Sequence, residues 1–484
     1  MKEITKLGLI ETVIALKNKE FSSVELTNSY IKNIEANRKL NAFVTDSFDL
    51  AIEMAKKSDA KIAAGNAGIL EGIPLAIKDL FCTKNIRTTS CSKILENFVP
   101  PYESTVTEKL WNEGALMLGK SNMDEFAMGS ANITSSFGPA INPYKRKNDE
   151  TNLVPGGSSG GSAVAVAANL CVAATGSDTG GSVRQPASFT NIVGVKPTYG
   201  RCSRYGMIAF ASSLDQAAIF TKNVRDSALL LKTISGYDSK DSTSMNKAVP
   251  DFDKLINSNI KGKKIGIPKE YQVEGMNKDV SKLWEKGIAT LKEKGAEIVD
   301  ISLPHTKYAP AVYYIVASAE CSSNLARYDG VRYGYRTKEQ NLSLEAMYEK
   351  TRSEAFGEEV KRRIMTGTYV LSAGYYDAYY KKAGQVRRLI LQDFQDAFKN
   401  VDVILTPVTP TSAFPIDQSL INKDPVAMYL NDIFTIPASL AGMPAASIPS
   451  GFDSDGLPLG LQIISNHFDE QAMFDVALAL EEGR

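Results

Sequence analysis

Apolar residues recur at helical spacing near the N-terminus of the chain. Ser22 and Glu25 stand three positions apart, the spacing of a capping box at the start of a helix. The helix that follows would place four apolar residues toward a core: Leu26, Tyr30, Ile31 and Ile34. We therefore expect residues 1–65 to form a helical segment that packs on the rest of the protein.

Further along, short apolar runs alternate with stretches of helical periodicity. Strands are expected at 72–81, 263–268, 296–301, 401–407 and 458–464, and a strand, turn and short helix at 115–132. Helices are expected at 277–294 and after residue 467, and a buried helix running into a strand at 162–178. This alternation, without an internal repeat or a linker, indicates a single large α/β/α domain over residues 1–484. Its central mixed β-sheet would be covered by helices on both faces.

Composition and charge narrow the classes of function. Lysine and arginine together number 55, and so do aspartate and glutamate, so the chain has no net positive charge that would favour binding to nucleic acid. Any RNA would be held mainly by another chain. The five cysteines are scattered and odd in number, which favours a reducing compartment and argues against zinc. No signal-peptide core and no apolar stretch of ~18 residues is present, so we expect a cytoplasmic protein without a membrane span.

Residues 155–163 read PGGSSGGSA and allow several interpretations. A flexible Gly/Ser linker is disfavoured because an apolar helix follows directly. A phosphate loop is disfavoured because Ser162 and Ala163 stand where Lys and Ser/Thr are required. A hydrolase elbow centred on Ser159 matches GxSxG and would need a later histidine, for which His467 stands in the expected order. This last alternative stays open.

A second glycine-serine motif follows at 176–187, GSDTGGSVRQPA. The two motifs together, from Gly156 to Pro186, resemble the amidase signature family, and every defined position of that pattern is filled. The lysine that this family carries in an apolar strand upstream is matched by Lys78 in IPLAIKDLF. The resemblance implies the amidase signature fold, hydrolysis or transfer at a carboxamide, and a catalytic core within 72–210.

The resemblance assigns a Ser-Ser-Lys triad with a physical role for each member. Ser182 would be the nucleophile, and Ser158, after a cis peptide bond, would relay its proton to Lys78. A lysine has an ordinary pKa of ~10.4, and burial in an apolar strand lowers that pKa toward neutrality. Asp79 should point to the opposite face of the strand.

The backbone N–H groups around the nucleophile would form the oxyanion hole. The expected donors are Thr179, Gly180, Gly181 and Ser182. Asp178 and Arg184 could pair and brace this turn, whereas Ser159 and Ser162 would be supporting hydrogen-bond groups.

The likeness extends to the glutamine-hydrolysing branch of the family, through segments such as MDEFAMGSAN, KPTYGRCSRYG and FGEEVKRRI. Members of this branch release ammonia from glutamine within a tRNA-dependent amidotransferase. The resemblance implies a heterotrimer with B and C subunits. The B subunit binds most of the tRNA and uses ATP and Mg²⁺, and no cofactor or metal is expected in the present chain. Aspartyl-tRNA(Asn) could be a second substrate of the complex.

The same resemblance implies a pocket for free glutamine. Arg362 would hold the α-carboxylate, with Arg363 as its competitor, and Asp432 would hold the α-ammonium. The rest of the pocket would be lined by Tyr313, Met128, Gly129 and Ser130. Two departures affect this pocket: the loop 129–138 carries Asn132 where an acidic residue is usual, and an insert occupies 144–153.

Two alternatives to a glutaminase role remain on sequence grounds. A stand-alone amidase of the same family would act on a small or fatty amide without partner subunits. A non-catalytic assembly subunit would tolerate loss of Ser182, but all three triad positions are filled.

Overall fold

The computed structural model describes residues 3–416 and 430–484. Its centre is an eleven-stranded sheet in the order β1-β3-β2-β4-β6-β5-β10-β11-β9-β7-β8. The strands are β1 (Phe43–Asp46), β2 (Pro74–Lys78), β3 (Leu116–Ser121), β4 (Ala173–Ser177), β5 (Val193–Lys196), β6 (Ala217–Thr221), β7 (Lys264–Pro268), β8 (Glu297–Ile301), β9 (Val403–Pro407), β10 (Ala445–Phe452) and β11 (Pro458–Ser465).

The sheet is mixed, as the sequence predicts. β2 runs parallel to both β3 and β4, and β7 runs parallel to β8 and β9. The strands between these two groups pair antiparallel, from β4 through β6, β5, β10 and β11 to β9. Parallel strands end at the same edge of a sheet, so Lys78 at the end of β2 lies near Ser177 at the end of β4.

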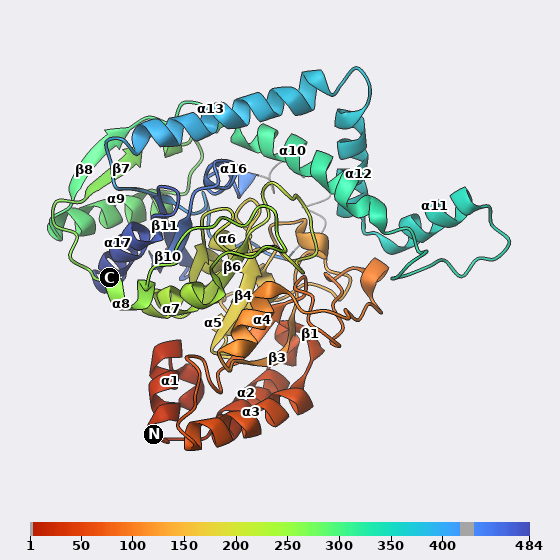
Figure 1. Ribbon diagram of the computed structural model, residues 1–484. Helices are drawn as coiled ribbons and strands as arrows, with labels where there is room; N and C mark the ends of the chain where they lie inside the picture. The colour runs from red at the N-terminus through yellow and green to blue at the C-terminus, as the bar shows by residue number, and fades with distance from the viewer. Residues whose placement is uncertain (1–2, 417–429) are drawn as a thin grey trace.

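Helices cover the sheet on both faces (Figure 1), which confirms the predicted fold class. They are α1 (Leu9–Lys17), α2 (Ser23–Ala36), α3 (Phe48–Ala63), α4 (Thr105–Asn112), α5 (Gly160–Ala167), α6 (Arg184–Phe189), α7 (Val224–Ile234), α8 (Phe252–Leu255), α9 (Lys278–Glu293), α10 (Ala309–Asn324), α11 (Leu344–Ala355), α12 (Glu358–Leu371), α13 (Lys382–Ala397), α16 (Ile436–Leu440) and α17 (Glu470–Glu482). Helix α6 packs on β5, β10 and β11, and α5 packs on β2 and β4.

The N-terminal helices begin as the pattern predicts. Ser22 Oγ accepts a hydrogen bond from the Glu25 backbone N–H at 3.1 Å, and Glu25 Oε2 accepts one from the Ser22 N–H at 2.8 Å. This capping box starts α2, whose residues Leu26, Tyr30 and Ile34 are buried. Helix α2 packs on α3 and on β2, so this segment lies against the strand that ends in Lys78. The division into 1–65 and a catalytic core at 72–210 stays a prediction.

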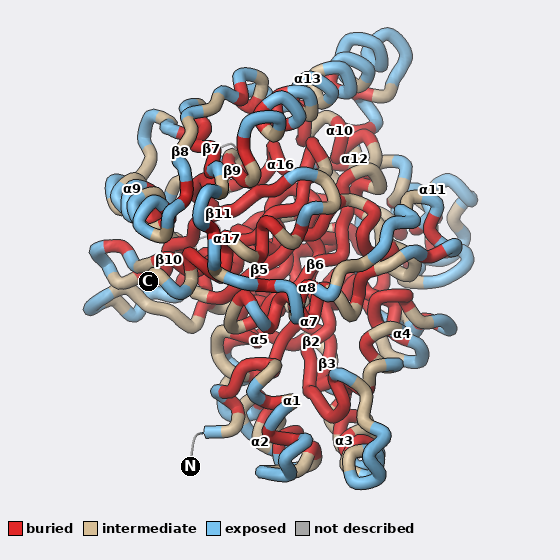
Figure 2. The backbone as a smooth tube through the Cα atoms, turned by 60° about the vertical axis from the view of Figure 1, so that its left-hand side comes forward, coloured by how far each residue is buried: buried red, intermediate tan, exposed pale blue. Residues whose placement is uncertain are grey.

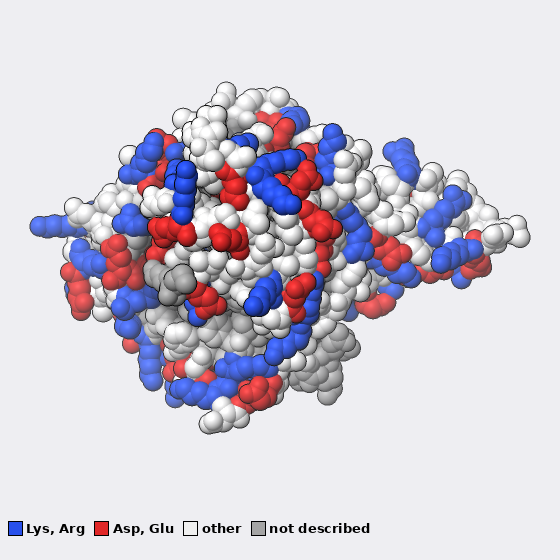
Figure 3. Space-filling view, turned by 90° about the horizontal axis from the view of Figure 1, so that it is seen from below, with Lys and Arg blue, Asp and Glu red and all other residues white. Residues whose placement is uncertain are grey.

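The central strands form the interior of the molecule (Figure 2). β2, β3, β4, β5 and β6 are buried along their whole length, as expected for strands covered on both faces. On the outside, charges of both signs are interspersed over the face shown in Figure 3. Among the described helices, none has the length and apolar character needed to cross a bilayer.

Candidate active site

Lys78 lies at the carboxyl end of β2, with its side chain fully buried. Its Nζ is within hydrogen-bond distance of three serine hydroxyls: Ser158 Oγ at 2.8 Å, Ser159 Oγ at 2.7 Å and Ser177 Oγ at 2.8 Å. Ser177 ends the neighbouring strand β4, and Ser158 and Ser159 directly precede α5. The peptide bond between Gly157 and Ser158 is cis. Two of the three residues of the predicted triad, Lys78 and Ser158, are therefore in contact.

Burial controls the charge of this lysine. Removal from water disfavours the ammonium form and lowers the pKa of Lys78 from 10.5 to about 7. The carboxylates of Asp124 and Asp178 act in the opposite direction, but they do not offset burial. Near neutral pH a large fraction of the Lys78 side chain is therefore an uncharged amine with a free electron pair.

The hydrogen bonds around Lys78 restrict where that electron pair can point. An uncharged amine has two N–H donors and one electron pair, so one of its three serine neighbours must donate to it. Ser159 Oγ gives its own proton to the Ser177 carbonyl oxygen at 3.2 Å, so it accepts from Lys78. The electron pair is then available only to the hydroxyl of Ser158 or of Ser177. The geometry allows Lys78 to act as a base toward Ser158.

Ser182 lies in the turn between β4 and α6 and is nearly buried. Its carbonyl oxygen accepts a hydrogen bond from the Ser159 N–H at 3.2 Å, which joins the two glycine-serine motifs. The described hydrogen bonds do not include one between Ser182 Oγ and Ser158 Oγ. Contacts of this kind often tighten only when substrate binds.

The backbone around Ser182 presents donors without acceptors. None of the N–H groups of Thr179, Gly180, Gly181 and Ser182 donates a hydrogen bond to a described residue. Their carbonyl and side-chain groups are fixed instead: Thr435 Oγ1 donates to Gly180 O at 2.7 Å, and Thr179 Oγ1 donates to Asp215 Oδ1 at 2.8 Å. Backbone N–H groups that are held in place and have no acceptor can donate hydrogen bonds to an oxyanion.

Two glycines in this turn are required by close contacts. Gly181 has φ +154°, and a Cβ built on it would lie 2.2 Å from Thr435 Oγ1. A Cβ on Gly180 would lie 2.8 Å from Cζ of Tyr313, which brings the buried Tyr313 ring against the turn. Larger residues would push the backbone amides out of place.

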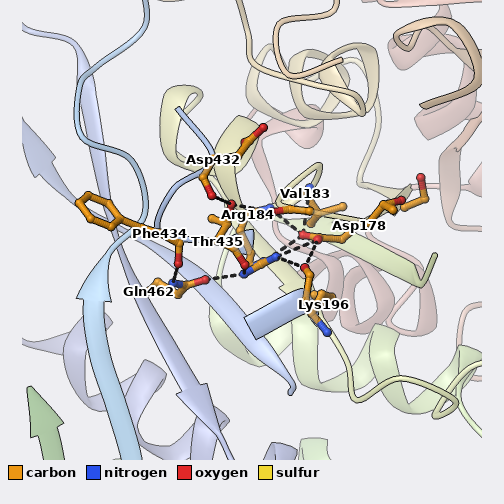
Figure 4. A network of polar contacts seen from close by, with 12 residues as sticks. Asp178, Val183, Arg184, Lys196, Asp432, Phe434, Thr435 and Gln462 are labelled. Carbon is orange, nitrogen blue, oxygen red and sulfur yellow. Dashed lines mark hydrogen bonds and ion pairs between the residues drawn. The ribbon is translucent and has the colours of Figure 1, made fainter. Parts of the chain in front are cut away.

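A buried ion pair holds the turn from behind (Figure 4). Arg184 contacts both carboxylate oxygens of Asp178, through Nε at 3.0 Å and through Nη2 at 2.9 Å. Arg184 Nη1 donates to Thr435 O at 2.8 Å and to Gln462 Oε1 at 2.6 Å. Burial would raise the pKa of Asp178, but the charge and hydrogen bonds of Arg184 outweigh it and lower that pKa. The pair expected from the sequence is thus present and fully buried.

Asp432 carries a buried carboxylate oxygen without a partner. Its Oδ1 has no hydrogen bond to a described group, and it would lie 3.2 Å from a Cβ on Gly181. Burial raises the pKa of Asp432 to about 7. A hydrogen bond with Ser130 acts to lower this pKa, and the negative charge of Asp178 acts to raise it further. This free carboxylate oxygen, buried beside the turn, can accept a hydrogen bond from a cationic group of a ligand.

The two arginines of α12 differ sharply in position. The side chain of Arg362 is 51 % exposed and pairs with Glu359, which also pairs with Arg363: Arg363 Nε lies 2.8 Å from Glu359 Oε1. Arg363 is buried, lies over the Tyr314 ring at 4.8 Å, and acts electrostatically on both Asp432 and Tyr313. Arg363 is thus the buried arginine of the two and interacts with other predicted pocket residues, and the assignment of the α-carboxylate to Arg362 stays a prediction. The helical face that carries Val360, Arg363 and Gly367 is the buried one.

The loop with Met128, Gly129 and Ser130 contacts α10 and the residue Gln185 of α6. Met128 Sδ lies 3.7 Å from Cys321 Sγ of α10, the helix that carries Tyr313. Gly129 lies against Asp124, since a Cβ there would be 2.5 Å from the Asp124 carboxylate carbon. Ser130 O accepts a hydrogen bond from Gln185 Nε2 at 2.7 Å, and Gln185 Oε1 accepts one from the Gly157 N–H at 2.9 Å. Gln185 joins this loop to the first serine motif, a role that its place in the VRQPA motif does not reveal.

The altered loop is built around buried polar groups. Asp124 accepts hydrogen bonds from the N–H groups of Asn132, Ile133 and Thr134. Asn132 Oδ1 accepts one from the Gly161 N–H at 2.9 Å, at the start of α5. The insert at 144–153 makes contacts elsewhere: the Lys147 N–H donates to Asp455 O at 3.0 Å, between β10 and β11. Asn132 therefore holds the start of α5, the helix that directly follows Ser158 and Ser159.

The histidine-dependent alternative finds no support in the described contacts. His467 Nε2 lies 2.9 Å from Ala441 O, and His305 Nδ1 lies 2.8 Å from Asp393 Oδ1. Ser159 Oγ contacts Lys78 and Ser177 instead. Within residues 3–416 and 430–484, no group of three His, Cys, Asp or Glu side chains could hold a metal ion.

Comparisons with known proteins agree with this arrangement. The family model described as "Amidase" matches residues 25–474. The A subunit of glutamyl-tRNA(Gln) amidotransferase from Sinorhizobium medicae is 60 % identical over 484 residues, which are 100 % of this chain and 98 % of the relative. Its counterpart from Parvibaculum lavamentivorans is 58 % identical over 482 residues, 100 % of this chain and 97 % of the relative.

Solved structures give the same picture. The crystal structure of the glutamyl-tRNA(Gln) amidotransferase A subunit from Thermotoga maritima superposes with a TM-score of 0.81 at 40 % identity, covering 100 % of this chain and 96 % of that one. A peptide amidase in complex with the inhibitor chymostatin superposes with a TM-score of 0.82 at 28 % identity, covering 99 % and 97 %.

Proposed function

Because the chain belongs to the amidase signature family, we propose that it is the glutamine-hydrolysing A subunit of a glutamyl-tRNA(Gln) amidotransferase. The observation that carries the proposal is the buried Lys78 amine, 2.8 Å from Ser158 Oγ and next to a turn of unpaired backbone N–H groups. This arrangement can activate a hydroxyl and stabilise an oxyanion without a metal or a histidine.

In the first half-reaction Ser182 is acylated. The uncharged Lys78 takes the proton of Ser158, Ser158 takes the proton of Ser182, and Ser182 Oγ attacks the side-chain amide carbon of glutamine. The N–H groups of residues 179–182 bind the oxyanion. The tetrahedral intermediate collapses as the proton returns from Lys78 through Ser158 to the amide nitrogen, so ammonia leaves and a γ-glutamyl ester remains on Ser182.

In the second half-reaction water removes the acyl group. The same lysine and serine accept a proton from water, which attacks the ester carbonyl at the same oxyanion site. Ser182 leaves as the alkoxide and regains its proton by the reverse relay. The net change is glutamine plus water to glutamate plus ammonia, and every protein group returns to its starting state.

Recognition of free glutamine uses the charged groups outside the triad. Asp432 would bind the α-ammonium through its unpaired Oδ1, and Arg363 would bind the α-carboxylate. Met128, Gly129, Ser130 and Tyr313 line the space between them. Arg363 is proposed here in place of Arg362 because it is buried and acts electrostatically on Asp432 and Tyr313, whereas the Arg362 side chain is half exposed.

The relatives' designation as an A subunit supports partner chains. We propose a heterotrimer with B and C subunits, in which the B subunit uses ATP and Mg²⁺, holds the tRNA and receives the ammonia. This is consistent with equal numbers of acidic and basic residues in the present chain. A cytoplasmic location and activity toward aspartyl-tRNA(Asn) stay predictions.

The proposal is tested by glutaminase assays of the full chain, alone and co-purified with its partner subunits. Wild type should release ammonia from glutamine and support amidation of glutamyl-tRNA(Gln), whereas Ser182→Ala should do neither with glutamine. Amidation should return for Ser182→Ala when ammonium salt is supplied. Hydrolysis of many unrelated amides by the isolated chain, with no partner bound, would support the stand-alone amidase instead.

A further inference from the structure

Glu125 joins two walls of the glutamine pocket that are far apart in sequence. It belongs to the short turn Glu125–Ala127, directly before Met128, Gly129 and Ser130. Its carboxylate is buried, with Oε2 accepting a hydrogen bond from the Gly357 N–H at 2.9 Å and Oε1 accepting one from Ser92 Oγ. Gly357 is the N-cap of α12, the helix that carries Arg363.

The Glu125 carboxylate binds the N-cap residue of α12 through that residue's backbone N–H. Glycine has no side chain to accept a bond from the first turn of the helix, and Gly357 forms no side-chain cap. Burial raises the pKa of Glu125 to about 7, and the helix dipole favours the ionised form of a carboxylate at a helix N-terminus. Lys361, one turn into α12, adds a favourable charge interaction with Glu125.

The contact is close-fitting and supported by a second one. A Cβ built on Gly357 would lie 2.3 Å from Glu125 Oε2, so only glycine allows the carboxylate to approach. The next residue of the turn, Phe126, packs edge-on against Phe356 with ring centroids 5.9 Å apart. Two consecutive residues of the turn thus hold two consecutive residues at the start of α12.

We propose that Glu125 is a positioning residue for glutamine, which holds the start of α12, and through it Arg363, in register with the 128–130 loop. The inference rests on the proposed function, because its effect is exerted on the arginine that binds the α-carboxylate. Glu125 touches neither the reacting amide nor Lys78. Its loss should weaken glutamine binding and leave the chemical step nearly intact.

The test compares Glu125→Gln, Gly357→Ala and Arg363→Met in the full chain purified with its partner subunits. Glu125→Gln replaces one acceptor oxygen by an amide, and we expect KM for glutamine to rise roughly tenfold while kcat stays within about threefold. Gly357→Ala should give the same pattern, since its methyl group displaces the carboxylate. The control is Glu358→Gln, an exposed acid in the first turn of the same helix, which should change KM less than about twofold.

A double-mutant cycle separates positioning from general destabilisation. In the Arg363→Met background, adding Glu125→Gln should lower kcat/KM less than about twofold further, because the arginine that it positions is already gone. Additive losses, an unchanged KM, or a fall in kcat equal to the fall in kcat/KM would overturn the inference. Absence of glutaminase activity in wild type would instead overturn the proposed function.

Discussion

Ser159 Oγ accepts a hydrogen bond from Lys78 Nζ at 2.7 Å and gives its own proton to the carbonyl oxygen of Ser177 at 3.2 Å. Because the Ser159 hydroxyl already donates its proton to that carbonyl oxygen, it cannot also donate to the electron pair of Lys78 Nζ. That electron pair then faces Ser158 or Ser177, and Ser158 is the one in the catalytic relay that we propose. Ser159 therefore orients the base without taking part in proton transfer.

The first prediction concerns this orienting serine. Ser159→Ala removes one hydrogen bond that fixes the Lys78 amine, and we expect kcat to fall roughly tenfold, the equivalent of about 1.4 kcal/mol. Ser162→Ala is the matched control, since the Ser162 hydroxyl is equally buried but bonds Ser121 Oγ at 2.6 Å and not the lysine. Steady-state glutaminase assays measure both. Equal losses in the two variants would contradict a specific role for Ser159.

The second prediction is a pH dependence set by Lys78. The base must be uncharged, and burial lowers the pKa of Lys78 to about 7. We therefore expect kcat to rise with pH, to be half-maximal near 7 and to level off above it. Below that point kcat should fall about tenfold per pH unit. A kcat that is constant from about pH 5.5 to 8.5, measured with saturating glutamine, would show that no such group is titrating.

The third prediction concerns the ammonium site. Burial raises the pKa of Asp432 to about 7, so its charged form, which binds the substrate cation, is lost as the pH falls below neutrality. The pH profile of kcat/KM should therefore be steeper than that of kcat, because two groups must be deprotonated in the free enzyme. Asp432→Asn should raise KM roughly 10- to 100-fold and reduce the slope of the kcat/KM profile to that of one group. If the slope of the kcat/KM profile is unaltered in Asp432→Asn, the second titrating group is a residue other than Asp432.

The fourth prediction distinguishes the adjacent arginines. Arg363→Met should raise KM for glutamine by roughly 10- to 100-fold, since a charged hydrogen-bond partner of the α-carboxylate is lost. Arg362→Met should change KM less than about twofold, because its side chain is 51 % exposed whereas Arg363 is buried, although both arginines pair with Glu359. Both KM values are obtained from glutaminase assays. The reverse ranking would favour Arg362 as the carboxylate-binding residue.

The fifth prediction concerns stability. Arg184→Met leaves the fully buried carboxylate of Asp178 without its partner, and we expect the free energy of unfolding to fall by about 3–5 kcal/mol. Calorimetry or denaturant unfolding measures the change. The control is Arg225→Met, whose ion pair with Glu482 lies on the surface and should contribute less than about 1 kcal/mol. A small effect at Arg184 would mean that Asp178 finds another partner or becomes protonated.

Much of the fold follows from local pattern, and the site follows from motifs. The capping box of Ser22 and Glu25, the apolar run that ends in Lys78, and the two glycine-serine motifs are all short-range signals. They predict a helix start, a buried strand and two turns, and the structure contains each of them. The helices α10, α12 and α13 are not predicted, because their buried faces include residues that tertiary packing alone buries, such as Tyr313 in α10, Arg363 in α12 and Asp393 in α13.

The pocket shows where sequence reasoning ends. The run Lys361-Arg362-Arg363 gives no sign of which arginine faces inward. The packing of α12 on α10, where Gly367 lies against the Ser318 backbone, decides it. The contacts of Ser177, Gln185 and Glu125 likewise depend on segments distant in the chain. The residues next to a polar residue in the sequence do not show which distant residue it will contact in the fold.

The central claim is that Ser182 becomes acylated because an uncharged Lys78 removes its proton. Rapid acid quenching of the complex during glutamine turnover, followed by mass spectrometry of the peptides, tests it most directly. We predict a γ-glutamyl adduct on the peptide that contains Ser182, formed faster as the pH rises through about 7, and no adduct in Lys78→Ala. An adduct on Ser159, or undiminished acylation of Lys78→Ala, would contradict the account.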